Sequence, residues 1–263
     1  MNCIVTTIRK QSIKAENLAA EIAKLLQIPY IPREGLGIDT IRRRFDVDTI
    51  IIATQNCPIV STTNGDYFFH LSMAELRINK LLNDEGDHMV AAMDLQPGQS
   101  VLDCTLGMGT DAIVASYIAG KQGRVIGLEA SAIIALVTSF GLKHFSTPDI
   151  PPEILTALRT ITVQHIDSFS FLKSMPDNSF DIVYFDPMFR QPVANSMNLK
   201  PLRELANKEP LNRDILVEAC RVASRRVVIK ETKDSPEFTR LGIKHFSGGK
   251  YSRVQYGIIH TGG

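Results

Sequence analysis

The sequence lacks the features that mark membrane-spanning, disulfide-stabilised and metal-binding proteins. No uninterrupted apolar run approaches the roughly 20 residues that a membrane-spanning helix requires. The cysteines are few and scattered, and they form no Cys-x-x-Cys pair of the kind found in zinc sites. They are Cys3, Cys57, Cys104 and Cys220. We therefore expect a cytoplasmic protein with no metal and no membrane partner.

Signals for secretion, hydrolysis and covalent catalysis are also missing. The first twelve residues, MNCIVTTIRKQS, have neither the long apolar core nor the cleavage site of a secretory signal. The six histidines show no metal-ligand spacing and have no serine or cysteine partner in a recognisable elbow. No cysteine follows a proline, as a cytosine-C5 methyltransferase would require. These absences disfavour hydrolases and enzymes with a covalent cysteine intermediate.

What is present is an ordinary globular composition with an uneven distribution of charge. The 263 residues are 44% hydrophobic and 22% charged, enough for one large α/β domain or for a domain with a smaller companion. The net charge is only +1, but from Lys200 onward 13 Lys and Arg residues face 7 Asp and Glu residues. This basic segment either faces nucleic acid or forms a solvated surface.

The first 86 residues read as a small α/β unit. Cys3–Ile8 is a β-branched run, and Ser12–Leu26 has helical periodicity with Ser12 as its N-cap. Asn64-Gly65 suits a tight hairpin turn. The basic triplet Arg42–Arg44 is either a solvated helix face or an RNA contact. We place a domain boundary near residue 86, which divides the chain into residues 1–86 and 87–263.

The second part alternates short apolar runs with segments long enough for helices, a pattern typical of a parallel sheet covered on both faces. Two closely linked strands then follow near the C-terminus and must pair antiparallel. The predicted fold is α/β, a mostly parallel sheet that ends in an antiparallel hairpin. It suits the Rossmann-like class I methyltransferases better than a plain dinucleotide-binding fold. The expected parallel strands are Ser100–Asp103, Arg124–Glu129, Thr160–Gln164, Asp181–Asp186 and Arg226–Lys230.

A glycine loop follows the first of these strands. Gly107 and Gly109 let the backbone turn sharply and approach a ligand, before a helix that begins near Thr110. Ligands of such sheets lie beyond the carboxyl ends of the strands. Glu129, twenty residues after Gly109, ends the next strand, where a carboxylate can accept hydrogen bonds from both hydroxyls of an adenosine ribose. The same spacing also satisfies the NAD fingerprint.

Acidic side chains around this loop favour a cofactor without phosphates. Asp103 directly precedes the loop, where it suits the cationic amino-acid end of S-adenosylmethionine and would repel a pyrophosphate. Asp111 at the start of the helix argues the same way, with helix capping as its alternative role. Asp167 and Ser168 follow the third strand and either bind the adenine edge or cap the next helix.

The segment Asp186-Pro187-Met188-Phe189 is the most specific in the chain. An apolar strand leads directly into a carboxylate, a stiff proline turn and an aromatic residue. The exocyclic amine of a base is a poor nucleophile because its lone pair is delocalised into the ring. Asp186 can orient such an amine by accepting its hydrogen bond, while Phe189 stacks on the base, a contact worth about 1–3 kcal/mol.

This tetrapeptide resembles the (Asn/Asp/Ser)-Pro-Pro-(Tyr/Phe) signature of methyltransferases that act on amino groups of nucleic-acid bases. A second motif, Asp-x-Thr-x-Gly-x-Gly-x-Asp-Ala, lies at 103–112, with Thr105 as its threonine. On these two motifs the chain, over roughly 86–263, resembles the family of the small-subunit ribosomal RNA guanine-N2 methyltransferase J. That resemblance implies S-adenosylmethionine as cofactor and RNA as partner. The cofactor contacts that it implies are Thr110, Asp111, Glu129, Ala130, Asp167, Ser168 and Asp186.

The leading hypothesis is therefore an S-adenosylmethionine-dependent N-methyltransferase acting on a base of ribosomal RNA, with guanine N2 as the best single candidate. The transfer would be direct, without metal or covalent intermediate. The alternatives are a methyltransferase of a small amine or metabolite, an NAD-dependent oxidoreductase, and a cofactor-binding module without catalysis. The oligomeric state and the role of residues 1–85 stay open.

Overall fold

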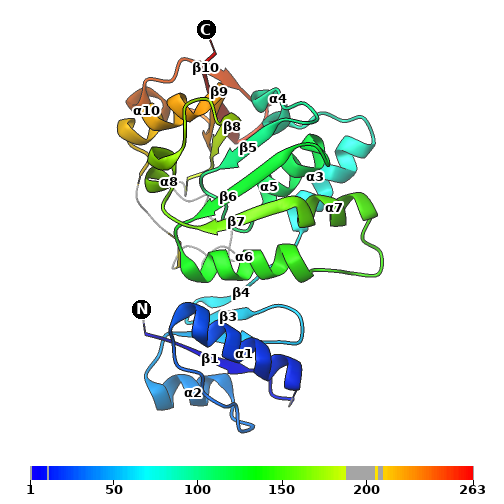
Figure 1. Ribbon diagram of the computed structural model, residues 1–263, viewed down its shortest axis with the longest axis vertical. Helices are drawn as coiled ribbons and strands as arrows, with labels where there is room; N and C mark the ends of the chain where they lie inside the picture. The colour runs from blue at the N-terminus through cyan, green and yellow to red at the C-terminus, as the bar shows by residue number, and fades with distance from the viewer. Residues whose placement is uncertain (1, 11, 188–204, 207–209, 263) are drawn as a thin grey trace.

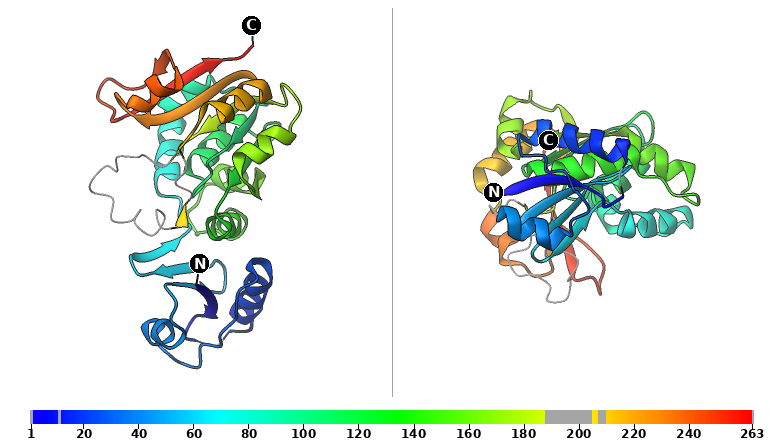
Figure 2. Two further views of the ribbon diagram at one scale, coloured as in Figure 1. Left: turned by 90° about the vertical axis from the view of Figure 1, so that its left-hand side faces the viewer. Right: turned by 90° about the horizontal axis from the view of Figure 1, so that it is seen from below.

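The computed structural model describes residues 2–10, 12–187, 205–206 and 210–262, and these form two β-sheets with helices around them (Figure 1). The small sheet is N-terminal and the large sheet contains the rest of the strands. No helix within the described ranges combines the length and apolarity needed to cross a bilayer. In the left view of Figure 2, helix α6 (Ala132–His144) is seen nearly end-on, directly above the N-terminal unit.

The N-terminal unit is a three-layer α/β arrangement in miniature. Its elements are β1 (Cys3–Thr7), α1 (Ile13–Leu26), α2 (Ile38–Phe45), β2 (Thr49–Ala53), β3 (Ile59–Thr62) and β4 (Gly65–Phe68). The sheet order is β1-β2-β3-β4, with β1 parallel to β2 and the others antiparallel. Alternate residues of β1 face opposite sides, since Val5 packs in the cluster that contains Leu18 of α1, whereas Ile4 packs with Ile41 of α2.

Local sequence signals in this unit are confirmed. Ser12 caps α1 by accepting a hydrogen bond from the backbone N–H of Ala15 at 3.5 Å. The Asn64-Gly65 turn joins β3 to β4, with Thr62 opposite Gly65 in the antiparallel ladder. Arg42 of the basic triplet donates hydrogen bonds to Ser61 and to the carbonyl of Thr62, so this arginine ties α2 to the sheet.

The large sheet has the strand order β10-β11-β9-β8-β5-β6-β7. Its strands are β5 (Ser100–Asp103), β6 (Arg124–Glu129), β7 (Ile161–His165), β8 (Phe180–Phe185), β9 (Ala223–Thr232), β10 (His245–Ser247) and β11 (Val254–His260). The strands β5 to β9 are parallel, and β10 and β11 form the predicted antiparallel pair. β11 lies between β9 and β10, and it pairs antiparallel with both. From β5 the strand order runs one way to β6 and β7 and the other way to β8 and β9. Ligands of such sheets bind at this switch point between β5 and β8.

Helices cover both faces of the large sheet (Figures 1 and 2). They are α3 (Ser72–Leu82), α4 (His88–Met93), α5 (Thr110–Ala119), α6, α7 (Pro152–Thr160), α8 (Ser168–Ser174), α10 (Arg213–Val222) and α11 (Pro236–Leu241). Successive strand residues belong to different cores. Val101 and Ile182 lie in the cluster formed with α4, α5 and α6, whereas Leu102 and Val183 lie in the cluster formed with α8, α10 and α11. Both faces are therefore apolar, as the near-continuous hydrophobic runs predicted.

The two sheets share one hydrophobic core. Val60 and Tyr67 of the small sheet belong to the same buried cluster as Val137 and Leu142 of α6. Helix α3, which precedes residue 86, packs against α5 of the large sheet. The domain boundary near residue 86 stays a prediction.

The closest packing in this shared core predicts an effect on stability. A Cβ added at Gly141 of α6 would lie 1.9 Å from Cγ of Phe69, a buried ring that also packs edge-on against Phe145. We expect Gly141→Ala to lower the free energy of unfolding, because overpacking costs about 1–3 kcal/mol and exceeds the roughly 0.5–1 kcal/mol that alanine gains inside a helix. Urea denaturation measures it. Gly86→Ala, with no atom within 4 Å of the added Cβ, is the control, and equal midpoints for both variants would contradict the prediction.

Candidate active site

The glycine loop between β5 and α5 forms the predicted sharp turn. Gly107 and Gly109 have φ of +53° and +81°, in the left-handed region that glycine adopts most readily. Gly109 is the N-cap of α5. Thr138 of α6 holds the loop from behind, because its hydroxyl donates a hydrogen bond to the carbonyl of Gly107 at 2.6 Å. The turn is thus anchored by a helix that also carries the contact with the N-terminal unit.

Acidic side chains stand at the carboxyl ends of three neighbouring strands. Asp103 ends β5, Glu129 ends β6, and Asp167 follows β7. The Glu129 carboxylate accepts hydrogen bonds from the backbone N–H groups of Gly107, at 3.0 Å, and Ser131, at 2.8 Å. Burial raises the pKa of Glu129, against the effect of these bonds. The second strand end is therefore bonded directly to the glycine loop.

The end of β7 lies beside the end of β6, since the backbone N–H of Ile166 donates to the carbonyl of Glu129 at 3.2 Å. Asp167 caps α8 by accepting from the backbone N–H of Ser170 at 2.8 Å, which is the capping role that the sequence allowed, and Ser168 begins that helix. Ala130 follows Glu129, and its carbonyl lies 3.2 Å from Nε2 of His165. Among the contacts of the described residues, none joins Asp167 or Ser168 to the end of β8.

Asp186 lies directly after β8 and adjoins the glycine loop. Its backbone N–H donates to the hydroxyl of Thr105 at 2.5 Å, and its carboxylate accepts from Nζ of Lys230 at 2.8 Å. Pro187 is the next residue described. The predicted Met188 and Phe189 lie outside the described residues. The structure therefore brings together the end of β8 and the loop after β5, which are about 80 positions apart in sequence.

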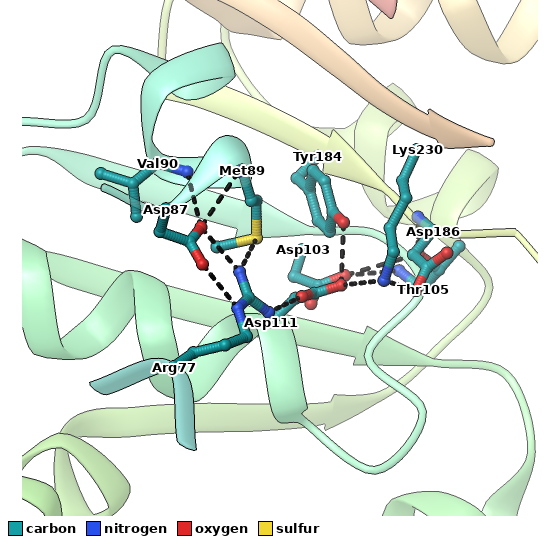
Figure 3. Close-up of polar contacts among 10 residues, drawn as sticks. All are labelled: Arg77, Asp87, Met89, Val90, Asp103, Thr105, Asp111, Tyr184, Asp186 and Lys230. Carbon is teal, nitrogen blue, oxygen red and sulfur yellow. Dashed lines mark hydrogen bonds and ion pairs between the residues drawn. The ribbon is translucent and has the colours of Figure 1, made fainter. Parts of the chain in front are cut away.

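Lys230 lies between two carboxylates (Figure 3). Its ammonium donates to Oδ2 of Asp186 at 2.8 Å and to Oδ2 of Asp111 at 2.9 Å. The hydroxyl of Tyr184 also donates to Oδ2 of Asp111, at 2.8 Å. The Lys230 side chain is 20% exposed. It is therefore not a plain surface lysine, because it is bound by one carboxylate after β8 and one in the first turn of α5.

Arg77 of α3 extends this network from Asp111 to Asp87 (Figure 3). Its guanidinium forms an ion pair with Asp111 and two hydrogen bonds with Asp87, at 2.7 and 2.9 Å. Asp87 in turn caps α4 through the backbone N–H groups of Met89 and Val90. One arginine thus ties α3, α4 and α5 together next to the strand ends.

The network determines the charge of its carboxylates. Although burial raises the pKa of Asp111, Lys230 and Arg77 outweigh it and hold that pKa well below its ordinary value. The pKa of Lys230 is raised, since the two aspartates outweigh the opposing effect of burial. Burial raises the pKa of Asp186 to about 6, with Lys230 pulling it down and Asp111 pushing it up. Asp111 is therefore a fixed anion, whereas the pKa of Asp186 is raised to about 6.

The sequence did not indicate the roles of some residues in this network. The sequence allowed helix capping for Asp111, but Gly109 caps α5 and the Asp111 side chain lies in the ion-pair network. Arg77, Tyr184 and Thr138 were not predicted at all. Tyr184, a polar-tipped residue two positions before Asp186 in an apolar strand, was the one local signal available. Arg77 gave none, because its partners Asp87 and Asp111 are 10 and 34 residues away in sequence.

Asp103 generates a prediction about stability. It is 2% exposed, accepts from the backbone N–H of Thr105 at 3.0 Å, and forms no ion pair within the described part of the chain. Burial raises its pKa to about 8 from 3.8, with Asp111 and Asp186 adding to the shift. Between these values the folded protein keeps a proton that the unfolded chain releases, so this group's contribution to stability is lost as pH rises toward about 8.

We expect Asp103→Asn to raise the melting temperature of the ligand-free protein, and the gain to grow between about pH 5 and about pH 8. Asparagine keeps an acceptor for the Thr105 N–H and does not ionise. Differential scanning calorimetry over this range checks the expectation. Asp66→Asn, at an exposed position on β4, is the matched control. A gain for Asp103→Asn that does not change with pH would contradict the prediction.

The chain is similar in sequence to several known proteins. A protein of Bacillus subtilis (strain 168) described as uncharacterized protein YpiP is 34% identical over 258 residues, which cover 98% of this chain and 99% of that protein. Ribosomal RNA small subunit methyltransferase J of Dechloromonas aromatica is 27% identical over 64% of this chain and 68% of its own length. The same enzyme of Hydrogenovibrio crunogenus is 26% identical over 59% of this chain and 56% of its own length.

A solved SAM-dependent methyltransferase from Neisseria gonorrhoeae has the same fold, with a TM-score of 0.64 at 15% identity over 98% of this chain and 95% of that one. The model of a family described as putative SAM-dependent methyltransferase matches residues 68–256. That range contains the glycine loop, Asp186 and Lys230, and the match leaves the NAD-dependent oxidoreductase without support. The chain belongs to this family of class I, S-adenosylmethionine-dependent methyltransferases.

Proposed function

We propose that this protein transfers the methyl group of S-adenosylmethionine to an exocyclic amine of a base in ribosomal RNA, in the cytoplasm, with guanine N2 as the first candidate. The observation that carries the proposal is the position of Asp186. Its carboxylate follows β8, precedes Pro187 and is bonded through its backbone to Thr105 of the glycine loop. The relatives named ribosomal RNA small subunit methyltransferase J support RNA as the substrate class.

The acidic side chains suit S-adenosylmethionine. Asp103 is a buried carboxyl without a cation of its own among the described residues, which fits the ammonium group of the methionine end. Glu129 keeps lone pairs for the ribose hydroxyls, and Asp167 with Ser168 suits the edge of the adenine. The remaining residues that we assign to the cofactor site are Thr105, Gly107, Gly109, Thr110, Ala130 and Asp186.

Asp111 has a different role in this proposal. Its two carboxylate oxygens are engaged by Arg77, Lys230 and Tyr184. We therefore assign Asp111 to the support of Lys230 rather than to direct contact with the cofactor. This changes the role that the family resemblance implied for it, because a carboxylate with three donors has little capacity left for a ligand.

The proposed chemistry is positioning. S-adenosylmethionine, when bound, supplies an electrophilic methyl group on a sulfonium. Asp186 accepts a hydrogen bond from the NH₂ of the base and so directs the nitrogen lone pair at that methyl, and Lys230 keeps this carboxylate ionised and in place. Phe189, which lies outside the described residues, stacks on the base in this proposal. The proton leaves to solvent after methylation.

A deletion strain tests the substrate and the role of Asp186 together. We expect nucleosides from its small-subunit ribosomal RNA to lack one methylated base. The wild-type gene should restore that base, whereas Asp186→Ala should not, because loss of the orienting acceptor lowers the rate by at least about a hundredfold. Mass spectrometry identifies the nucleoside. Asp181→Asn, at the opposite end of β8, is the control and should restore it.

Calorimetric titration with S-adenosylmethionine should still detect binding to the Asp186→Ala protein. Restoration of the modified base by Asp186→Ala would refute the role of this carboxylate. Ribosomal RNA that is fully methylated in the deletion strain would instead favour the second candidate, a methyltransferase of a small amine or metabolite, for which the near-neutral net charge speaks.

Lys230 predicts a shift in the pH dependence of the reaction. Burial raises the pKa of Asp186 to about 6 and Lys230 opposes this rise, while Asp111 adds to it. Removing the lysine charge in Lys230→Met should raise that pKa further. The increase of kcat with pH should then move to higher pH, because only the ionised carboxylate of Asp186 is free to accept the hydrogen bond of the amine. Lys230→Arg keeps the charge and is the matched control; a Lys230→Met profile identical to wild type would contradict the assignment.

A further inference from the structure

The structure separates the described basic residues of the segment from Lys200 onward into two groups. Several of them are neutralised by carboxylates in ion pairs with Asp94, Asp111, Asp177, Asp186, Glu218 and Glu237. These engaged residues are Arg221, Arg225, Arg226, Lys230 and Arg240. The other described basic residues, Arg213, Lys233, Lys244, Lys250 and Arg253, form no ion pair with any described carboxylate, and all five are exposed. The basic excess that the sequence showed is therefore available to a partner at these positions.

Three of these cations, Lys233, Lys250 and Arg253, gather where β9 ends and β11 begins. The backbone N–H of Lys233 donates to the carbonyl of Arg253 at 2.8 Å, and its Nζ donates to the carbonyl of Lys250 at 3.3 Å. Asp234 is the acidic residue next to them, so the local charge stays positive. With Tyr251 these three residues form what we call the β10–β11 loop surface.

This surface lies at the edge of the sheet that carries the active site. β11 starts with Val254, which pairs with Thr232, the last residue of β9, and Tyr256 pairs with Lys230. Lys233 is three residues beyond Lys230, or about 10 Å along an extended chain. The loop also packs toward the ion-pair network, because a Cβ at Gly249 would lie 2.5 Å from Nε2 of His88, the neighbour of Asp87.

Tyr251 adds an aromatic ring to the charges. It is 90% exposed, so folding gains almost nothing from it, and Nζ of Lys250 lies 5.5 Å from the centre of its ring. Proteins bind single-stranded nucleic acid by combining two kinds of side chain: lysines and arginines contact the phosphates, and a neighbouring aromatic ring stacks on a base. A double helix would not fit this surface as well, because its bases are already stacked on one another.

We propose that the β10–β11 loop surface binds a single-stranded segment of RNA adjacent to the target base. The cations contact the phosphates and Tyr251 stacks on an unpaired base, while the target amine reaches Asp186 at the same edge of the sheet. The inference rests on the proposed function and names the surface by which the RNA is held.

The test uses the full-length protein and protein-free small-subunit ribosomal RNA from the deletion strain as the probe. Filter binding across a salt series compares wild type with the triple variant Lys233→Gln, Lys250→Gln and Arg253→Gln. We expect the affinity of the triple variant to fall at least tenfold at low salt, and the slope of log K against log salt to become shallower by about 2. In steady-state assays the KM for RNA should rise while kcat is kept.

Tyr251→Ala separates stacking from charge. It should weaken binding by about tenfold without a change in the salt slope, and Tyr251→Phe should bind as wild type does. The matched control for the charges is the triple variant Lys121→Gln, Lys143→Gln and Lys173→Gln, three exposed lysines elsewhere around the large sheet. Lys173 lies over the ring of Phe169 as Lys250 lies over that of Tyr251. All variants should bind S-adenosylmethionine and unfold like wild type.

A wild-type protein that binds and methylates the RNA, with a loop triple variant of unchanged slope and KM, overturns the inference but leaves the proposed function standing. A loss seen only with assembled small subunits, and not with protein-free RNA, places a ribosomal protein on this surface and also overturns it. A wild-type protein that neither binds nor methylates RNA overturns the proposed function first, and this inference with it.

Discussion

The ammonium of Lys230, held between Asp111 and Asp186, is the interaction on which the rest of the site depends. The three residues come from β9, α5 and the end of β8, which are distant in sequence. Two carboxylates this close together in a poorly solvated site cannot both be ionised without a cation between them. The lysine therefore does two things: it sets the charge of the site, and it holds the strand end that carries Asp186 against the glycine loop.

The N-terminal unit contributes to the same site through packing and charge. β4 and the residues after it pack on α6, and Thr138 of that helix holds the glycine loop through the carbonyl of Gly107. Arg77 of α3 supplies the second cation for Asp111. Asp103, by contrast, is buried without a cation, at a cost to stability that a positively charged ligand would offset. The protein thus balances most of its buried charge internally and leaves one carboxyl for the cofactor.

Much of the fold could be predicted, because it follows from local patterns. Apolar runs separated by helix-length segments require a parallel sheet, and two closely linked strands require an antiparallel pair. β5 and β6 begin and end where the sequence placed them, and Ser12 caps α1. The insertion of β11 between β9 and β10 was not predictable in this way, because the pairing partner of a strand depends on long-range packing rather than on its own alternation.

The sequence by itself determined the class of the protein and the chemistry at its strand ends. Gly107, Gly109, Asp103 and Asp186 carry local signals, since a glycine turn, a carboxylate and a proline restrict the backbone wherever they occur. The tertiary structure alone decided what each charge does. Asp111 could cap a helix or bind a ligand, and Lys230 could face solvent, until folding brought them to within 2.9 Å of each other. Ion pairs between distant elements leave no periodicity in the sequence, because their energy depends on distance and burial in space.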